Sequence, residues 1–256
     1  LYQDKLLIAT HDAHLVALNA QTGDVEWDVQ VGDWSIGQHY SGGPMIIKGR
    51  VVAGMSGCYH LNTRCWVSAH DIETGSEVWR TYTIPAPGEF GYDSWGDIPE
   101  EDRRGGSPWN SPSYDPELNL IYTGVGVPIP WGSVQRGSGD GDVLYTNSTL
   151  ALDADTGEIV WYFQHIPNDE WDLDHPFARL VVETEVSPGA VAWRNEGITP
   201  GRRRKIVTGI PGKTGIVWAL DAATGAFLWA QPTNQQNVVV DIDAESRRVL
   251  LNSSLK

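Results

Sequence analysis

Hydrophobic and polar residues alternate over short stretches of this chain. Val25, Trp27 and Val29 are separated by single acidic residues, and residues 159–163 follow the same period with Trp161 at their centre. A period of two is typical of a strand with one buried face. Since no stretch shows a convincing helical period, we predict an all-β protein.

One sequence pattern occurs at 17–27, 69–79, 151–161 and 219–229, and each copy reads A-x-[ND]-x-x-T-G-x-x-x-W. A short apolar strand leads to the Asn or Asp, the Gly permits a tight turn, and a second strand carries the Trp. Each copy therefore predicts a β-hairpin with an aromatic anchor.

A further β-rich run precedes each copy, such as KLLIAT before the first and RKIVTG before the fourth. Each repeat is therefore predicted to form three or four strands. Radially stacked four-stranded sheets with long loops on one face are the architecture of a β-propeller. We predict that residues 1–256 form a single partial propeller domain of about four blades, truncated at both ends.

Composition and charge exclude several classes of function. The chain has 18 Lys and Arg against 33 Asp and Glu, a formal net charge of −15, which disfavours DNA and RNA as partners. No window reaches the roughly 18 uncharged apolar residues of a membrane-spanning helix. The 41% of hydrophobic residues fits a globular protein.

The chain contains two cysteines, Cys58 and Cys65. A disulfide between them would close a short loop and indicate an oxidising compartment. The alternative is a pair of separate free thiols.

Two long insertions, 85–114 and 164–180, are the expected places for function, because loops on a rigid scaffold carry binding groups. The second contains four carboxylates within QHIPNDEWDLDHPFARL. In an extended segment, Asp172 and Asp174 point to the same side, an arrangement that suits a hard cation. The alternative is an ordinary solvated acidic loop.

These repeats and insertions resemble the quinoprotein alcohol dehydrogenases of the methanol and ethanol dehydrogenase type. The repeat is similar to the tryptophan-docking motif of that family. The resemblance implies about half of an eight-bladed propeller, with pyrroloquinoline quinone (PQQ) and a metal ion on its axis.

The resemblance assigns roles to the carboxylate pair. In the segment EWDLDH, Asp172 corresponds to the catalytic base, which accepts the hydroxyl proton of the alcohol while hydride passes to the quinone. Calcium-type members have a small residue two positions later and lanthanide-type members have Asp, as Asp174 here. The alternative for Asp174 is a loop acid or a strand cap.

The resemblance also implies the residues that hold the quinone. Trp109, in GSPWNSPSYDPELNLIYTG, corresponds to the aromatic floor of the cofactor. The other implied cofactor-binding residues are Ser41, Ser56, Gly57, Cys58 and Lys213. A structural tryptophan and a plain surface lysine are the alternatives for Trp109 and Lys213.

Two positions depart from the metal site of the family. The ligand Glu is replaced by Tyr59 or, with one inserted residue, by His60, and the ligand Asn is replaced by Val127. The predicted metal ligands are therefore Asp172, Asp174 and His60, for Ca²⁺ or a lanthanide ion. A braced turn is the role we expect for a disulfide next to the cofactor.

The main hypothesis is a periplasmic PQQ-dependent alcohol dehydrogenase that oxidises a small alcohol and passes electrons to cytochrome c. One alternative is a non-catalytic propeller scaffold of the outer-membrane assembly type, which has no need of the combination of Trp109, Asp172, Asp174 and Lys213. Another is a degenerate dehydrogenase that binds the quinone but has lost its metal.

Overall fold

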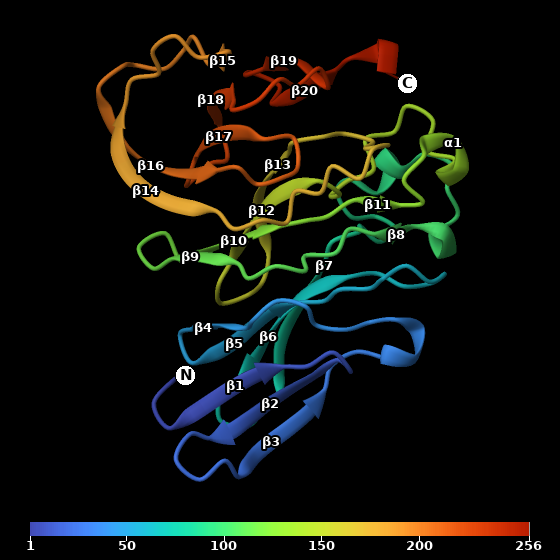
Figure 1. Cartoon of the computed structure of the whole chain (residues 1–256), viewed down its shortest axis with the longest axis vertical. Helices are drawn as coiled ribbons and strands as arrows, with labels where there is room; N and C mark the ends of the chain where they lie inside the picture. The colour runs from blue at the N-terminus through green and yellow to red at the C-terminus, as the bar shows by residue number, and fades with distance from the viewer. Residues whose placement is uncertain (256) are drawn as a thin grey trace.

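The computed structural model describes residues 1–255 and consists of antiparallel sheets that follow one another along the long axis of the molecule (Figure 1). The first sheet contains β1 (Lys5–Ala9), β2 (His14–Asn19) and β3 (Val25–Gln30). The second contains β4 (Met45–Ile47), β5 (Arg50–Gly54), β6 (Trp66–Asp71) and β7 (Glu77–Tyr82). Both have their strands in sequence order.

The third sheet has the order β13-β12-β10-β9, with β9 (Ser113–Asp115), β10 (Leu120–Gly124), β12 (Ser148–Asp153) and β13 (Ile159–Gln164). The fourth has the order β14-β16-β17-β18-β15, with β14 (Leu180–Val186), β15 (Trp193–Arg194), β16 (Arg202–Gly209), β17 (Ile216–Asp221) and β18 (Phe227–Pro232). Smaller elements complete the fold. They are the ribbon of β8 (Arg104–Gly105) and β11 (Pro128–Ile129), the hairpin of β19 (Val239–Asp243) and β20 (Arg248–Leu251), the short helix α1 (Ser133–Arg136), and the 3-10 turns η1 (Trp34–Ile36), η2 (Tyr92–Trp95), η3 (Glu100–Asp102) and η4 (Ser253–Leu255).

The repeated pattern forms the predicted hairpins. In the second copy, one carboxylate oxygen of Asp71 accepts hydrogen bonds from the backbone N–H groups of Glu73 (3.0 Å) and Thr74 (2.9 Å), which closes the turn. The equivalent residues Asn19, Asp153 and Asp221 make the same pair of bonds in the other copies.

Each of the first three motif tryptophans docks on the turn of the following sheet. The indole N–H groups of Trp27, Trp79 and Trp161 donate to the carbonyls of Ile72 (2.9 Å), Ala154 (3.3 Å) and Ala222 (3.1 Å). The rings lie against Gly75, Gly157 and Gly225, all with positive φ, where a Cβ would meet the indole at 2.7 Å or less. The aromatic anchors thus join consecutive sheets, as in a partial β-propeller.

Buried apolar residues form the core between consecutive sheets. One cluster, centred on Trp161, Phe163 and Trp218, joins the third and fourth sheets. A second cluster joins the first two sheets around Leu15 and Val51, and a third joins the middle two. Because these three clusters lie between neighbouring blades, the loops at the blade ends remain available to form a site.

The fourth sheet differs from the expected three or four strands per repeat. The segment 187–201 contains the short strand β15, which adds a fifth strand at the edge of β18, where Trp193 pairs with Ala230. This stretch, SPGAVAWRNEGITPG, has no clear alternation of polar and apolar residues, so nothing in it indicates a strand.

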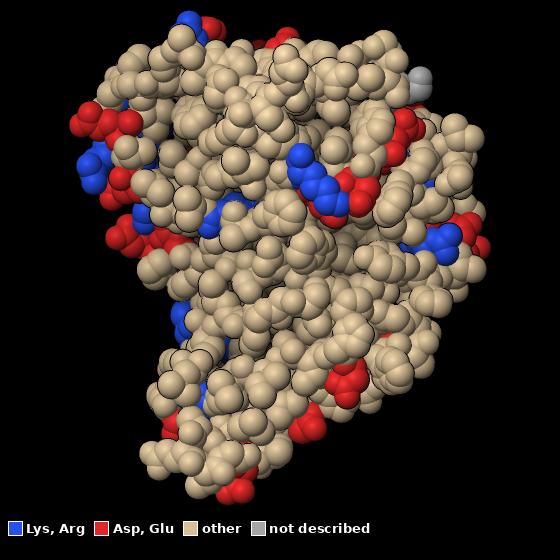
Figure 2. All heavy atoms as spheres, viewed as in Figure 1, with Lys and Arg blue, Asp and Glu red and all other residues tan. Residues whose placement is uncertain are grey.

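No helix among residues 1–255 is long and apolar enough to cross a membrane. On the face shown in Figure 2, the Lys, Arg, Asp and Glu side chains lie in small separate groups among other residues. This face therefore carries no continuous basic surface of the kind that binds nucleic acid.

Candidate functional site

The acidic segment between β13 and β14 is shaped by a carboxylate that we did not single out from the sequence. The buried side chain of Asp169 accepts hydrogen bonds from the backbone N–H groups of Trp171 (2.8 Å) and Leu173 (2.7 Å). The side-chain amide of Asn147 donates to the same group at 2.7 Å. Burial raises the pKa of Asp169. Three donors on one carboxylate hold this loop in a defined shape.

Asp172 and Asp174 lie on either side of one ammonium group. The Nζ of Lys213 is 2.8 Å from a carboxylate oxygen of Asp172 and 2.9 Å from one of Asp174. The backbone N–H of Lys213 also lies within hydrogen-bond distance of the carbonyls of Leu173 (3.2 Å) and Asp174 (3.1 Å). The three charged groups therefore belong to one compact cluster, although Lys213 follows the pair by about 40 residues.

The electrostatics of this cluster follow from partial burial. Burial raises the pKa of Asp174, and the charge of Asp172 adds to this effect, although Lys213 opposes it. Burial lowers the pKa of Lys213, but its hydrogen bonds to Asp172 and Asp174 outweigh burial, and the net shift is upward. Grouping the two carboxylates in a partly buried place therefore costs free energy, and the positive charge of Lys213 offsets that cost.

Trp109 lies beside this cluster. A Cβ placed on Gly126 would be 2.9 Å from a carboxylate oxygen of Asp174 and 3.6 Å from the indole Nε1 of Trp109. The absence of a side chain at Gly126 therefore lets the carboxylate and the indole approach each other. Phe177 packs edge-on against the indole, with ring centroids 5.8 Å apart and an interplanar angle of 84°.

The predicted residue Ser41 connects the turn of Ser56, Gly57 and Cys58 to Trp109. The hydroxyl groups of Ser41 and Ser56 are 2.8 Å apart, and Ser41 donates to the carbonyl of Trp109 at 3.2 Å. Gly57 adopts a φ of 75°, and a Cβ there would lie 1.9 Å from the carbonyl oxygen of Gly37. Only a glycine can occupy this position.

The disulfide predicted between Cys58 and Cys65 is confirmed, with an S–S distance of 2.06 Å. Both cysteines are fully buried. The carbonyl of Cys58 accepts from the backbone N–H of Gly105 (2.9 Å), and the sulfur of Cys65 lies 3.1 Å from the hydroxyl of Ser107. The disulfide therefore braces the turn, as we expected, and ties it to the segment that leads to Trp109.

The structure does not bring His60 together with the carboxylate pair. The His60 ring lies next to Gly37, where a Cβ would be 3.5 Å from its Cδ2. Within residues 1–255, no three or more His, Cys, Asp or Glu side chains are grouped as a metal site. The Tyr59 side chain is 53% exposed, and partial burial followed by the charges of Asp174 and Asp172 raises the pKa of its hydroxyl.

The alternative ligand position is also apolar in the structure. Val127 is buried and contributes only its backbone N–H, which donates to Asp174 at 3.3 Å. The oxygen donors that the structure groups here are therefore the two carboxylates. Oxygen donors of this kind suit a hard cation such as Ca²⁺ or a lanthanide.

A buried basic group supports the far end of the acidic segment. The guanidinium of Arg179 donates to the carbonyl of His175 (2.6 Å) and to the hydroxyl of Thr149 (2.9 Å). Burial lowers the pKa of Arg179 to about 9. The His165 and His175 rings stack beside it with centroids 5.0 Å apart. A lone His or Arg in the sequence carries no signal for such a cluster, so sequence reasoning missed it.

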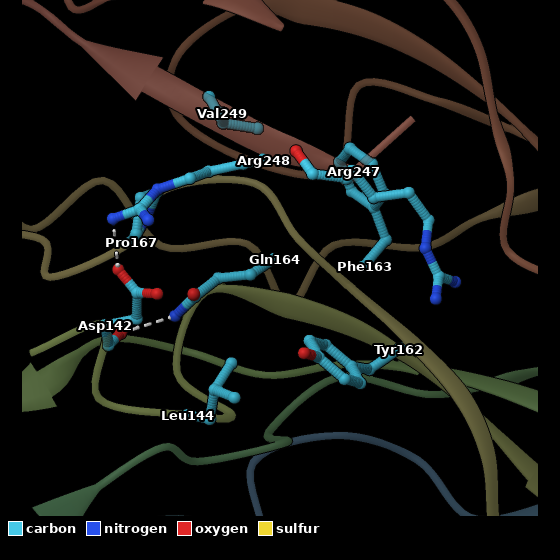
Figure 3. A pocket seen from close by; sticks show the side chains of 10 residues that line it. Asp142, Leu144, Tyr162, Phe163, Gln164, Pro167, Arg247, Arg248 and Val249 are labelled. Atoms are coloured by element: carbon cyan, nitrogen blue, oxygen red, sulfur yellow. Dashed lines mark hydrogen bonds and ion pairs between the residues drawn. The ribbon is translucent and has the colours of Figure 1, made fainter. Parts of the chain in front are cut away.

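A separate pocket of about 280 Å³ lies between β13 and the β19–β20 hairpin (Figure 3). Arg248 reaches toward the carboxylate of Asp142 (3.5 Å), and the amide of Gln164 donates to the Asp142 carbonyl (2.7 Å). None of the sequence-predicted site residues lines it. This pocket is therefore distinct from the carboxylate cluster.

Comparison with known proteins supports one interpretation of this site. Residues 3–193 match the PQQ family described as "Glucose/ethanol/alcohol dehydrogenase, beta-propeller domain". The chain is 33% identical over 263 residues to quinohemoprotein alcohol dehydrogenase ADH-IIG of Pseudomonas putida, covering 98% of this chain and 34% of that protein. It is 32% identical to methanol dehydrogenase [cytochrome c] subunit 1 of Methylobacterium organophilum, covering 92% of this chain and 38% of that protein.

Solved structures of proteins with related names are also similar to this chain. The structure of ADHIIG from Pseudomonas putida HK5 superposes with a TM-score of 0.86 at 32% identity, over 99% of this chain and 36% of that one. A europium-containing methanol dehydrogenase gives a TM-score of 0.79 at 26% identity, over 98% of this chain and 44% of that one. The chain thus spans about a third of the length of the curated relatives it matches.

Proposed function

Because the chain belongs to the PQQ family of glucose, ethanol and alcohol dehydrogenase propeller domains, we propose that the protein oxidises an alcohol to the aldehyde with PQQ as cofactor. The observation that carries the proposal is the convergence of Asp172, Asp174 and Lys213 beside Trp109. A non-catalytic propeller has no need of such a grouping. This favours the enzyme over a scaffold of the outer-membrane assembly type.

The residues present fit the two groups that this chemistry requires. Asp172 and Asp174 offer hard oxygen donors for Ca²⁺ or a lanthanide ion, and the second carboxylate favours the trivalent ion. Trp109 offers an aromatic surface for a planar quinone. Ser41 and Ser56 offer hydroxyl groups on the segment bonded to Trp109. When bound, the quinone would accept hydride and the cation would act as a Lewis acid.

Asp172 is the residue we assign as the general base. Its carboxylate is about one-third exposed, so it can accept the hydroxyl proton of an alcohol that enters from solvent. The ammonium of Lys213 lies 2.8 Å from the Asp172 carboxylate and holds its side chain in place. Asp174 is more buried, with 14% exposure, which suits a ligand rather than a base.

The electron acceptor and the compartment are further parts of the proposal. We infer that cytochrome c accepts the electrons, because a relative carries this acceptor in its name. A location in the periplasm agrees with the Cys58–Cys65 disulfide, since disulfides persist in oxidising compartments.

The test is dye-linked oxidation of primary alcohols by the full-length protein, reconstituted with PQQ and either Ca²⁺ or a light lanthanide. We expect activity that Asp172→Asn and Asp174→Ala abolish. Glu170→Gln is the matched control, because it removes a charge from the same acidic run but can still accept from the backbone N–H of Ser133. No activity and no change in the absorption spectrum of the quinone with either metal would refute the proposal.

A further inference from the structure

We propose that Lys213 is a built-in counter-ion of the cation site, which occupies the space between Asp172 and Asp174 and must be displaced when a metal ion binds. This inference rests on the proposed function for the kind of cation involved. It adds a role for Lys213 before the site is loaded, beyond the contact with the quinone that the family resemblance implies.

The geometry supports competition for one position. The Lys213 ammonium is 2.8 Å from Asp172 and 2.9 Å from Asp174, so it bridges the same oxygen atoms that a metal ion would need. A cation that binds both carboxylates cannot share this space with the ammonium group. Metal binding therefore includes the free energy of breaking two ion pairs.

The backbone of Lys213 is held against the acidic segment. Its N–H group lies within hydrogen-bond distance of the Leu173 and Asp174 carbonyls, and a Cβ on the preceding Gly212 would lie 2.4 Å from the Asp174 carbonyl oxygen. The anchor of the side chain therefore stays near the carboxylates whether or not the ammonium contacts them. Its flexible four-carbon stem allows the ammonium to turn away while the backbone stays fixed.

The charge balance of the cluster explains why such a counter-ion is needed. Asp174 is 14% exposed and lies close enough to Asp169 for their charges to interact. Asp172 and Asp174 together place two carboxylates around the single ammonium group of Lys213. Without a cation, the two carboxylates would repel each other. A trivalent ion offsets more of this charge than a divalent one.

The experiment is a titration of the full-length protein, prepared without PQQ, with Tb³⁺ under excitation of tryptophan. Trp109 lies beside Asp174 and can sensitise the luminescence of the bound ion. We expect Lys213→Met to lower the dissociation constant about tenfold or more, because the competitor is removed. Asp174→Asn should abolish the signal, which locates the ion.

Lys48→Met is the matched control. It removes the same single charge at an exposed ion pair, and Asp155 keeps its other partner, Arg50. Its dissociation constant for Tb³⁺ should equal that of the unmodified protein. Unchanged or weaker binding by Lys213→Met would overturn the proposal, as would the absence of any Tb³⁺ binding.

Thermal unfolding is a second measurement, which tests the proposal even if Lys213→Met is less stable than the unmodified protein. Without metal, Lys213→Met should have a lower thermal midpoint than the unmodified protein, and Tb³⁺ should raise it by a larger increment. Lys213→Gln serves where Lys213→Met does not fold, and equal increments would again contradict the proposal. None of these measurements involves quinone or alcohol. Failure of alcohol oxidation would thus refute the proposed function while leaving this result intact.

Discussion

The indole ring of Trp161 in the third sheet lies directly on Gly225 in the turn of the fourth. A Cβ on Gly225 would be 2.5 Å from the ring. The indole N–H of Trp161 donates to the carbonyl of Ala222 in the same turn at 3.1 Å. One contact thus combines shape and hydrogen bonding, and it joins two consecutive blades.

Gly225→Ala is therefore expected to destabilise the full-length protein. Its φ of 68° alone costs an alanine about 1 kcal/mol, and the clash with Trp161 adds about 1 to 3 kcal/mol. Gly201→Ala is the control, because Gly201 has a φ of 76° but no atom within 4 Å of a Cβ. Thermal unfolding of both variants separates the two effects. Equal losses would show that the contact contributes nothing.

The turn aspartates should make stability depend on pH. The hydrogen bond from Thr74, together with those from the backbone, holds the pKa of Asp71 below its ordinary value of 3.8. A lowered pKa in the folded state gives stability that is present above 3.8 and is lost as the pH falls through the folded pKa.

Asp71→Asn tests this relation, because Asn19 makes the same turn in the first copy of the repeat. We expect the difference in thermal midpoint between the unmodified protein and Asp71→Asn to shrink from pH 7 to pH 3. Asp71→Ala should cost about 1 kcal/mol at pH 7, because the turn loses its acceptor. A difference that does not change with pH would contradict the assignment.

Removal of the disulfide should weaken the wall of the site. For a loop as short as that between Cys58 and Cys65, the loss of the cross-link costs about 2 to 3 kcal/mol. The variant with both cysteines replaced by serine should have a lower thermal midpoint that reductant no longer changes. Alkylation of the unmodified protein, denatured but not reduced, should add no mass because both cysteines are in the disulfide. Adducts on both residues would exclude the bond.

Asp169 is expected to be essential for the shape of the acidic segment. Asp169→Ala leaves the N–H groups of Trp171 and Leu173 and the amide of Asn147 without their acceptor, at a cost of about 3 kcal/mol or more. Glu170→Ala, at the next position, should cost much less because Glu170 is only partly buried. Thermal unfolding and Tb³⁺ binding measure both effects. Equal behaviour of the two variants would contradict a special role for Asp169.

Trp109 should determine how tightly the quinone is retained. We expect Trp109→Ala to raise the dissociation constant of PQQ about tenfold or more, and Trp109→Phe to raise it less, because phenylalanine keeps an aromatic face. Trp34→Ala is the control, since Trp34 is 61% exposed and lies on η1. Fluorescence titration gives the constants. Unchanged binding by Trp109→Ala would remove this residue from the cofactor site.

The repeats, the hairpins and the aromatic anchors were all predictable from the amino-acid sequence. Their determinants are local: a period of two along each strand, an Asn or Asp that closes a turn, and a Gly with positive φ. The repeat suggested the family resemblance, and separate local motifs around Asp172, Asp174, Trp109 and Lys213 assigned these residues to the site. The strand β15 was not predictable, because its pairing depends on the free edge of β18 and not on its own residues.

The tertiary structure alone decided which of these side chains meet. It placed the Lys213 ammonium between Asp172 and Asp174, made Asp169 the acceptor that shapes their loop, and did not group His60 with the pair. These contacts join segments that are far apart in the chain. The sequence records residue types and local periodicity, whereas the distance between remote side chains depends on how the blades pack and on backbone approaches such as that at Gly126.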